Sequence, residues 1–302
     1  MPVSFWILDA APLFGVVAAA CTLALLGSFL ILQRQAMVGD AMAHSVLPGL
    51  VIAFVVTGSR APLPMFIGAL SAALIASLLI QGLTRIAGVE PTAAIGVVFT
   101  TLFALGVLLV ETTGARNVDL DLDCVLSGQL ELLFWPLPQG AAPWSPTALA
   151  KLPTPIVTLG ALMLASFATV LWFWKLIRAS LFDRHFGYAR GLRPGFVRGG
   201  LLLATTATVV ASFEALGSIL VIALLTGPPA AARLLTQRMG PYVTMSACLG
   251  AAAGLIGYVI ATRVAPYFVG GAIDASGTVA ATAGVFVGLA ALYTIRSSNV
   301  EP

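Results

Sequence analysis

Long uncharged apolar runs recur along almost the whole chain, separated by short polar turns. A helix needs about 20 apolar residues to cross the roughly 30 Å hydrocarbon core of a bilayer, and these runs reach that length. The chain shows no ten-residue alternation of apolar and polar positions of the kind found in membrane barrels. The pattern therefore predicts an all-α integral membrane protein, a polytopic bundle of about eight to ten transmembrane helices. The expected spans are residues 12–33, 36–57, 63–84, 91–110, 152–174, 195–213, 214–232, 240–262 and 275–295.

The sixth and seventh spans abut, so we expect one of them to be short, broken or re-entrant. The second of these spans also contains the pair Pro228 and Pro229. Proline removes a helical hydrogen bond, which favours an interrupted helix beside protein or a water-filled cavity. Small residues around the prolines also suit close helix packing, and both interpretations stay open.

Composition agrees with a membrane protein, because 59% of the 302 residues are hydrophobic and only 9% are charged. The mean hydropathy is +1.02. We expect residues 1–302 to form a single transmembrane domain, with 111–151 as the longest polar segment. The net charge is +3, and the basic residues are too scattered along the chain to form a nucleic-acid-binding surface. We therefore expect the chain to contact membrane lipid and not nucleic acid. We expect no cleaved signal peptide, because Asp9 lies where such a peptide would carry a basic residue. The three cysteines show neither metal-ligand nor disulfide spacing.

The positions of lysine and arginine predict the orientation, because cytoplasmic loops are enriched in them. If residues 175–198 are cytoplasmic, the N-terminus lies outside, the C-terminus inside, and 111–151 forms an outer loop. The basic residues then on the inside are Arg34, Arg85, Lys175, Arg178, Arg184, Arg190, Arg193, Arg198, Arg233, Arg238 and Arg296. Only Arg60, Arg116, Lys151 and Arg263 remain outside.

Two ionisable residues interrupt the second span. Asp40 and His44 are four residues apart, so a helix places them on one face. Ionisable groups at membrane depth are costly and usually mark an ion pathway. Carboxylate and imidazole together suit zinc, manganese or ferrous iron better than copper(I). The alternative is that Asp40 only caps the helix and His44 is merely hydrogen-bonded within the bundle. Pro48, one turn further along, should kink the helix and could open carbonyl groups toward a cavity.

Further acidic residues are expected near the outer surface. The orientation places Glu214 near an outer helix end, where it could act at an entrance or gate, although it could also face a central lumen. Asp119, Asp121 and Asp123 alternate like the start of a calcium loop, but the required glycine and downstream glutamate are missing. We therefore expect an acidic outer mouth that raises the local cation concentration.

The segment 178–198 is the most basic part of the chain. It is either an ordinary cytoplasmic loop or, in its part 181–192, a short helix that docks a cytoplasmic partner. Exposed aromatic residues among charges favour an interface. His185 belongs to this segment and not to the ion pathway.

Five ordered blocks between residues 12 and 296 resemble the ABC-3 family, the zinc, manganese and iron permeases of ATP-binding cassette transporters. The blocks are Asp40–Gly49, Ala94–Gly106, Val118–Gly128, Phe182–Gly191 and 221–236. The first looks like the family signature D-x-x-x-H-[AS]-x-L-P-G, and the fourth looks like its coupling helix. The third is similar to manganese or iron members.

The resemblance implies a permease with a type II importer fold. It would pair with a second permease, identical or different, and with cytoplasmic ATPase subunits and an extracytoplasmic metal-binding protein. The implied residues are Asp40 and His44 for the metal, and Phe182, Asp183, Phe186, Gly187 and Gly191 for coupling to the ATPase. Gly187 replaces the usual alanine and should loosen that helix. The doubled proline at 228–229 also departs from the family pattern.

The leading hypothesis is thus a multi-pass permease of the bacterial inner membrane that transports Mn²⁺, Zn²⁺ or Fe²⁺ and holds no permanent cofactor. It is not itself expected to be an enzyme, because the chain contains no G-x-x-x-x-G-K-[ST] phosphate-binding loop. The alternative is a proton-coupled secondary metal transporter, with Asp40, His44 and Glu214 as a proton relay. A membrane enzyme or scaffold is the third class, but no nucleophile–base pair supports it.

Overall fold

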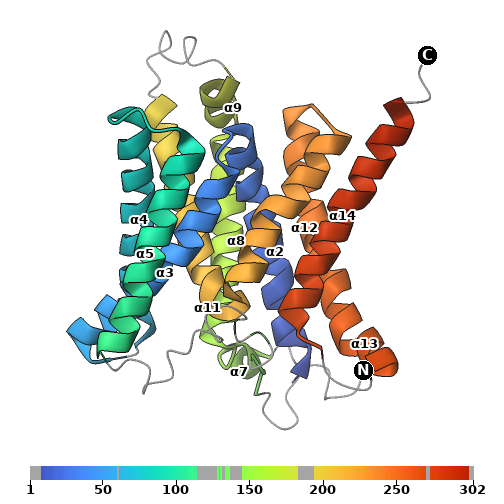
Figure 1. The fold of residues 1–302 in the computed structure, drawn as a ribbon. Helices are drawn as coiled ribbons and strands as arrows, with labels where there is room; N and C mark the ends of the chain where they lie inside the picture. Colours follow the sequence, from blue (N-terminus) through green and yellow to red (C-terminus); the bar gives the residue numbers. More distant parts are fainter. Residues whose placement is uncertain are drawn as a thin grey trace.

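The chain folds into a bundle of long helices that lie side by side (Figure 1). The computed structural model describes residues 8–59, 61–113, 128, 130, 133–136, 145–182, 194–269 and 273–298. For some of these residues, Asp40, Phe182 and Glu214 among them, it describes the backbone without the side chain. Throughout these residues the regular elements are helices, as the hydrophobic pattern predicts. They are α2 (Ala10–Leu32), α3 (Ala36–Thr57), α4 (Pro62–Arg85), α5 (Pro91–Thr113), α7 (Pro146–Leu149), α8 (Thr154–Trp172), α9 (Trp174–Phe182), α11 (Pro194–Leu235), α12 (Met239–Val259), the π-helical turn η3 (Ile260–Val264), α13 (Ala265–Val269) and α14 (Ala275–Ser298).

Eight segments of the described chain are long and apolar enough to span a membrane, and Gly199–Phe213 is a shorter apolar helix. The predicted multi-pass helical architecture is therefore confirmed. The two abutting spans form one element, α11, which is broken by the non-helical backbone of Gly217 (φ 76°, ψ 164°). The span expected at 152–174 corresponds to α8, and the short helix α9 follows it from Trp174. The span expected at 240–262 continues through η3 into α13.

Successive helices reverse direction, so α2 begins and α14 ends at opposite ends of the bundle (Figure 1). The α2–α3, α4–α5 and α11–α12 connections lie at the same end as α9. We infer that this end is cytoplasmic, because basic residues gather in these connections and helix ends. They are Arg34, Arg85, Lys175, Arg178, Arg233, Arg238 and Arg296.

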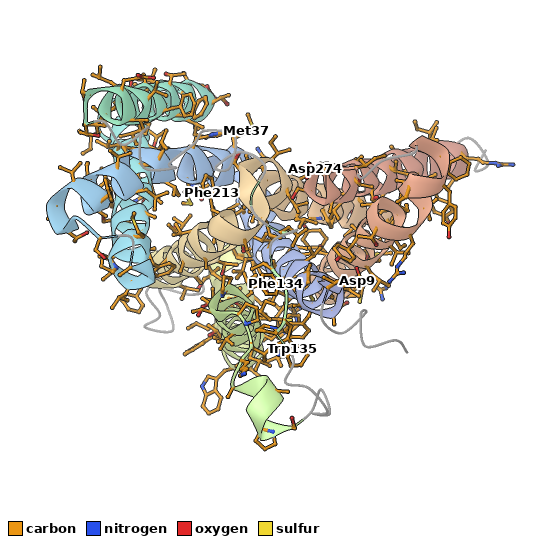
Figure 2. All side chains as sticks on the ribbon, turned by 90° about the horizontal axis from the view of Figure 1, so that it is seen from below. Asp9, Met37, Phe134, Trp135, Phe213 and Asp274 are labelled. Atoms are coloured by element: carbon orange, nitrogen blue, oxygen red, sulfur yellow. The ribbon has the colours of Figure 1, made fainter. Side chains whose placement is uncertain are left out.

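Helices α2 and α11 occupy the centre of the bundle. Seen from the opposite end, α3, α4 and α5 lie on one side of them and α12, α13 and α14 on the other (Figure 2). Helix α2 is 78% buried over its most apolar window. It packs against α11, α12 and α8. The hydroxyl of Tyr242 in α12 donates a 3.2 Å hydrogen bond to the carbonyl of Ser28 in α2.

The expectation of an interruption at Pro228 and Pro229 is wrong, because α11 stays helical through both. Proline at 229 has no N–H to donate to the carbonyl of Leu225, four residues earlier. That carbonyl instead faces α2 at Gly27, where an added methyl group would lie only 1.9 Å from the oxygen. Close approach of the two helices can satisfy such an oxygen through weak Cα–H contacts. Of the two interpretations, close helix packing is the one that the fold realises.

The outer end is fastened by an ion pair. Asp9 precedes the first turn of α2, and its carboxylate accepts a hydrogen bond from the guanidinium of Arg263 in η3. The π-helical turn thus ties the start of the central helix to the end of α12.

Candidate functional site

The imidazole of His44 lies between α3 and α5, packed against two phenylalanines. Its ring centroid is 4.9 Å from that of Phe99, and the planes are tilted by 57°. Phe103, one turn further along α5, meets the imidazole edge-on at 5.8 Å. The phenylalanine rings lie 6.1 Å apart. These aromatic contacts limit the rotation of the imidazole and so fix the direction in which it can present a ring nitrogen.

Asp40 lies in α3, one turn before His44, as the spacing predicts. Met42, between them, is fully buried, and its sulfur accepts a 3.2 Å hydrogen bond from the hydroxyl of Thr206 in α11. This bond connects the segment that carries Asp40 and His44 to the central broken helix.

Pro48 is buried inside α3, which remains one helix around it. Opposite it on α5 is Gly106, where an added methyl group would lie 2.9 Å from the proline Cδ. On the other side, Gly49 meets Gly68 of α4 in a similarly close contact. The α3 backbone is therefore held by neighbours on two sides one turn beyond His44.

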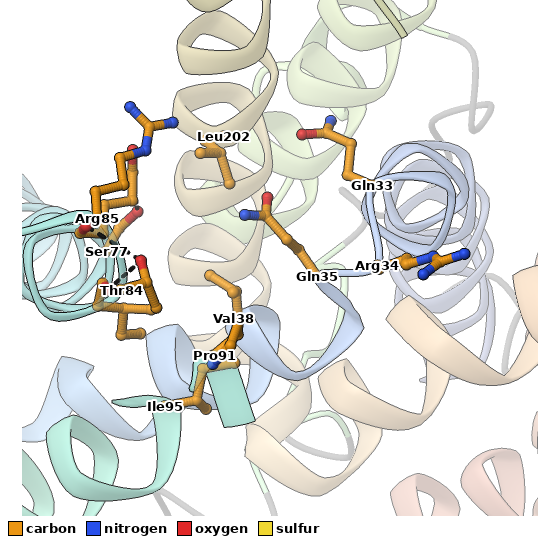
Figure 3. A pocket seen from close by; sticks show the side chains of 12 residues that line it. Gln33, Arg34, Gln35, Val38, Ser77, Thr84, Arg85, Pro91, Ile95 and Leu202 are labelled. Carbon is orange, nitrogen blue, oxygen red and sulfur yellow. Dashed lines mark hydrogen bonds between the residues drawn. The ribbon is translucent and has the colours of Figure 1, made fainter. Parts of the chain in front are cut away.

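A polar cavity of about 270 Å³ opens at the cytoplasmic end of the same α3–α5 seam (Figure 3). Its wall includes Gln35 and Val38 near the start of α3, and Ile95, which lies one turn before Phe99 on α5. Nine residues of helix separate positions 35 and 44, a rise of about 14 Å. The start of α3 that lines the cavity thus lies about 14 Å along the helix from the position of His44.

Two buried amides give this cavity its chemistry. The amide oxygen and nitrogen of Gln33 and the amide oxygen of Gln35 are shielded from solvent and find no hydrogen-bond partner among the described residues. Figure 3 shows both side chains directed toward the space in front of Leu202, whereas Arg34 extends away from it and Arg85 stands on the opposite wall. Neutral amide oxygens accept hydrogen bonds from water and can bind hydrated divalent cations. A guanidinium nearby opposes long retention of a cation, so the arrangement suits passage better than storage.

The break in α11 marks the other end of the molecule (Figure 1). Ser212 and Ser218 flank the break, are fully buried, and have hydroxyl groups without a hydrogen-bond partner in the described structure. Gly128, from the segment that follows the acidic triplet in sequence, packs directly on the backbone of Gly217. Glu214 lies three residues before the break in α11.

Other predicted site residues lie outside the described residues. These are the outer acidic residues Asp119, Asp121 and Asp123, and the coupling residues Asp183, Phe186, Gly187 and Gly191. Phe182 is the last residue of α9.

The family model of the ABC 3 transport family matches residues 6–133 and 149–291, nearly the whole chain. The chain belongs to the ABC 3 transport family.

Individual relatives agree with this membership. The chain is 36% identical over 295 residues to a manganese transport system membrane protein, MntD of Bacillus subtilis, covering 96% of this chain and 91% of that protein. It is 34% identical over 287 residues to a zinc transport system membrane protein, TroD of Treponema pallidum, covering 95% and 73%. The fold matches a chain of the PsaBC structure from Streptococcus pneumoniae with a TM-score of 0.71 and 23% identity, covering 93% of this chain and 89% of that one.

No group of three or more histidine, cysteine, aspartate or glutamate side chains that could hold a metal comes together in the part of this ABC 3 chain that the structure describes.

Sequence reasoning missed several residues of this region. Phe99 and Phe103 lie within the fourth-span block that resembles the family, and their i, i+4 spacing could have indicated a shared face. Gln33 and Gln35 gave no signal, because two amides beside a helix end look like an ordinary polar turn. Gly217 itself was not singled out, although the two expected spans meet close to it, at residues 213–214.

Proposed function

We propose that this ABC 3 chain is the permease subunit of an ATP-driven importer for a divalent metal ion, Mn²⁺ or Zn²⁺. The observation that carries the proposal is the half-buried His44 imidazole, packed against two aromatic rings on the helix whose start lines a polar cavity. Imidazole is a good ligand for both metals. The relatives named for manganese and for zinc support these two ions to a similar degree.

His44 and Asp40 would hold the ion together in transit. Two protein ligands bind a divalent ion weakly enough to release it, which a conducting site requires. Water, or a ligand from a second permease subunit, would complete the coordination. Gln33 and Gln35 would then receive the hydrated ion before it leaves.

At the outer end, Glu214 and the break in α11 would form the gate. Discontinuous helices commonly mark ion sites and gates in transporters, because the broken turn can change shape without unfolding the helices beside it. The acidic residues Asp119, Asp121 and Asp123 would attract cations to this entrance.

The partners follow from the same proposal. Cytoplasmic ATPase subunits would dock on residues 183–193, between α9 and α11, and an extracytoplasmic metal-binding protein would deliver the ion to the outer end. The chain would lie in the bacterial inner membrane beside a second permease, the same chain or another. The name PsaBC of the structural neighbour, and the paired names TroC and TroD of two relatives, support such a two-permease complex.

The decisive experiment measures uptake of radioactive Mn²⁺ and Zn²⁺ into proteoliposomes that contain the permease and its ATPase. His44→Phe keeps an aromatic ring against Phe99 and Phe103 but removes the ring nitrogens, so it should abolish uptake while the complex still assembles. Asp40→Asn should do the same, and Lys151→Gln, at an exposed residue after α7, is the control. Normal uptake by the His44 and Asp40 variants would overturn the assigned roles. Uptake that runs on a pH gradient without ATP would favour the secondary transporter.

A further inference from the structure

An apolar groove of about 200 Å³ runs between α8, α9 and α11 near the cytoplasmic end. Its walls include Phe173 at the end of α8, Leu176 and Ile177 of α9, and Val197, Gly200 and Leu201 of α11. The walls are almost entirely hydrocarbon. Such a groove is costly to fill with water and suits an aliphatic chain.

The groove lies on a side of the bundle that presents large apolar residues outward. Phe196, at its edge, is 84% exposed, and Trp172 at the end of α8 is 86% exposed. In a membrane-spanning bundle, side chains of this kind face lipid tails, and tryptophan prefers the interface between tails and headgroups. The groove is thus accessible from the cytoplasmic leaflet.

The basic residues of α9 indicate which kind of lipid headgroup is expected. Helix α9 is amphipathic: Leu176 and Ile177 line the groove, while Lys175 and Arg178 are exposed on the opposite face of the helix, as in a helix that lies at a membrane interface. Both belong to the end that the basic residues identify as cytoplasmic. Long basic side chains at this level extend toward the headgroups, where they attract anionic phosphates. Hydrocarbon groove and cationic pair together have the two chemistries of an anionic phospholipid.

We propose that this groove binds one acyl chain of an anionic phospholipid whose phosphate is held by Lys175 and Arg178. The lipid would bridge α9 and the start of α11, the two helices that flank residues 183–193. Binding itself does not depend on the transported ion. Only its consequence rests on the proposed function: a filled groove would steady both ends of the segment expected to contact the ATPase, so coupling would require anionic lipid.

Lipid retention tests the proposal directly. The purified full-length protein is exchanged into micelles with phosphatidylglycerol or phosphatidylcholine, and retained lipid is counted by native mass spectrometry while the melting temperature is recorded. Phosphatidylglycerol should be retained and should raise the melting temperature more than phosphatidylcholine, because a ligand of the folded state stabilises it. Lys175→Gln and Arg178→Gln should each weaken retention about fivefold, as expected for loss of one basic residue near a phosphate. Lys151→Gln, at the outer end, should not.

A matched pair of variants tests the groove itself. Gly200 lines it and Gly199 does not, and an added methyl group would meet no atom within 4 Å at either. Gly200→Leu should fill the groove and reduce phosphatidylglycerol retention, whereas Gly199→Leu should leave retention unchanged. Equal retention by the two variants, or equal binding of the two lipids, would overturn the proposal. So would a photo-crosslinker at Phe196 that captures the ATPase instead of lipid. Intact lipid binding without metal uptake would reject the proposed function and leave the lipid site standing.

Discussion

Gly49 of α3 and Gly68 of α4 approach each other so closely that each backbone fills the space of a side chain on the other. A methyl group built on Gly49 would lie 2.3 Å from the Gly68 carbonyl oxygen, and one on Gly68 would lie 2.5 Å from the Gly49 carbonyl oxygen. Small residues at a crossing let helix backbones meet without a hydrophobic driving force in lipid. This crossing, five residues beyond His44, fixes the position of α3 against its neighbour.

Gly49→Ala should therefore destabilise the protein by about 1–3 kcal/mol, because the contact is with backbone and cannot relax by a rotamer change. The melting temperature in detergent measures the effect. Gly96→Ala is the matched control, since a methyl group at Gly96 meets nothing within 4 Å. It should be neutral or stabilising by up to about 1 kcal/mol. Equal melting temperatures for the two variants would show that the crossing is not tight in the membrane protein.

Phe99→Leu should weaken metal transport while leaving the protein folded. An aromatic pair contributes about 0.5–1.5 kcal/mol beyond its buried area, so a loosened imidazole should raise the KM for uptake about two- to tenfold. The maximal rate should change less, because the ligand atoms remain. Phe268→Leu, on an 84% exposed residue of α13, is the control. A Phe99→Leu variant with wild-type KM would mean that the ring does not position His44.

Gly217→Ala should destabilise the protein and slow uptake, although it adds only one methyl group. The backbone of Gly217 has φ 76° and ψ 164°, a region that other residues occupy at a cost of about 1–3 kcal/mol. Gly288→Ala in α14, where an added methyl group meets nothing within 4 Å, provides the comparison. We expect a lower melting temperature and slower uptake for Gly217→Ala alone. A variant as stable and active as Gly288→Ala would show that the broken turn tolerates a straighter backbone.

Acid sensitivity should depend in part on Glu90. Its carboxylate accepts hydrogen bonds from the Thr92 hydroxyl at 3.0 Å and the Ala93 N–H at 2.9 Å, at the start of α5. Interactions with the Thr92 and Ala93 backbone lower the pKa of Glu90 from its ordinary value of 4.5, and the Thr92 hydroxyl adds to the effect. A lowered folded-state pKa means that this stabilisation is present above the ordinary value and is lost as the pH falls through the folded-state value.

Melting temperatures of wild type and Glu90→Gln should therefore differ at neutral pH and converge as the pH falls below about 4.5. A difference between the two proteins that stays constant over the same pH range would contradict a role for the ionised carboxylate.

The sequence predicts the helices well and the site only in part. Span length and lack of charge determine where helices cross a membrane, so α2 to α5 begin and end close to the expected residues. The spacing of Asp40 and His44 correctly places both on α3. The boundary between the two abutting spans was expected at residues 213–214, close to the break at Gly217, whereas the interruption expected at the doubled proline is absent. Whether a proline breaks a helix depends on what stands opposite, here Gly27 of a helix almost 200 residues earlier, and no local pattern contains that information.

The aromatic rings around His44 could not be predicted from the sequence for the same reason. Phe99 and Phe103 look like ordinary lipid-facing or core residues in the sequence, and only the packing of α5 on α3 brings them to the imidazole. The polar cavity is likewise assembled from the ends of α2, α3, α4 and α5 together with Leu202 of α11, and none of these segments indicates a cavity by itself.

The central position of α2 has a consequence for biogenesis. It is synthesised before the other described helices, and its neighbours α8, α11 and α12 are made more than a hundred residues later. Until those helices are made, the small and hydroxyl-bearing surface of α2 is exposed to lipid or to the insertion machinery. Gly27 and the carbonyl of Ser28 then lack the contacts that they make in the folded protein. Truncated chains that end before α11 should therefore be preferred substrates for membrane proteases, and assembly can be complete only when synthesis nearly is.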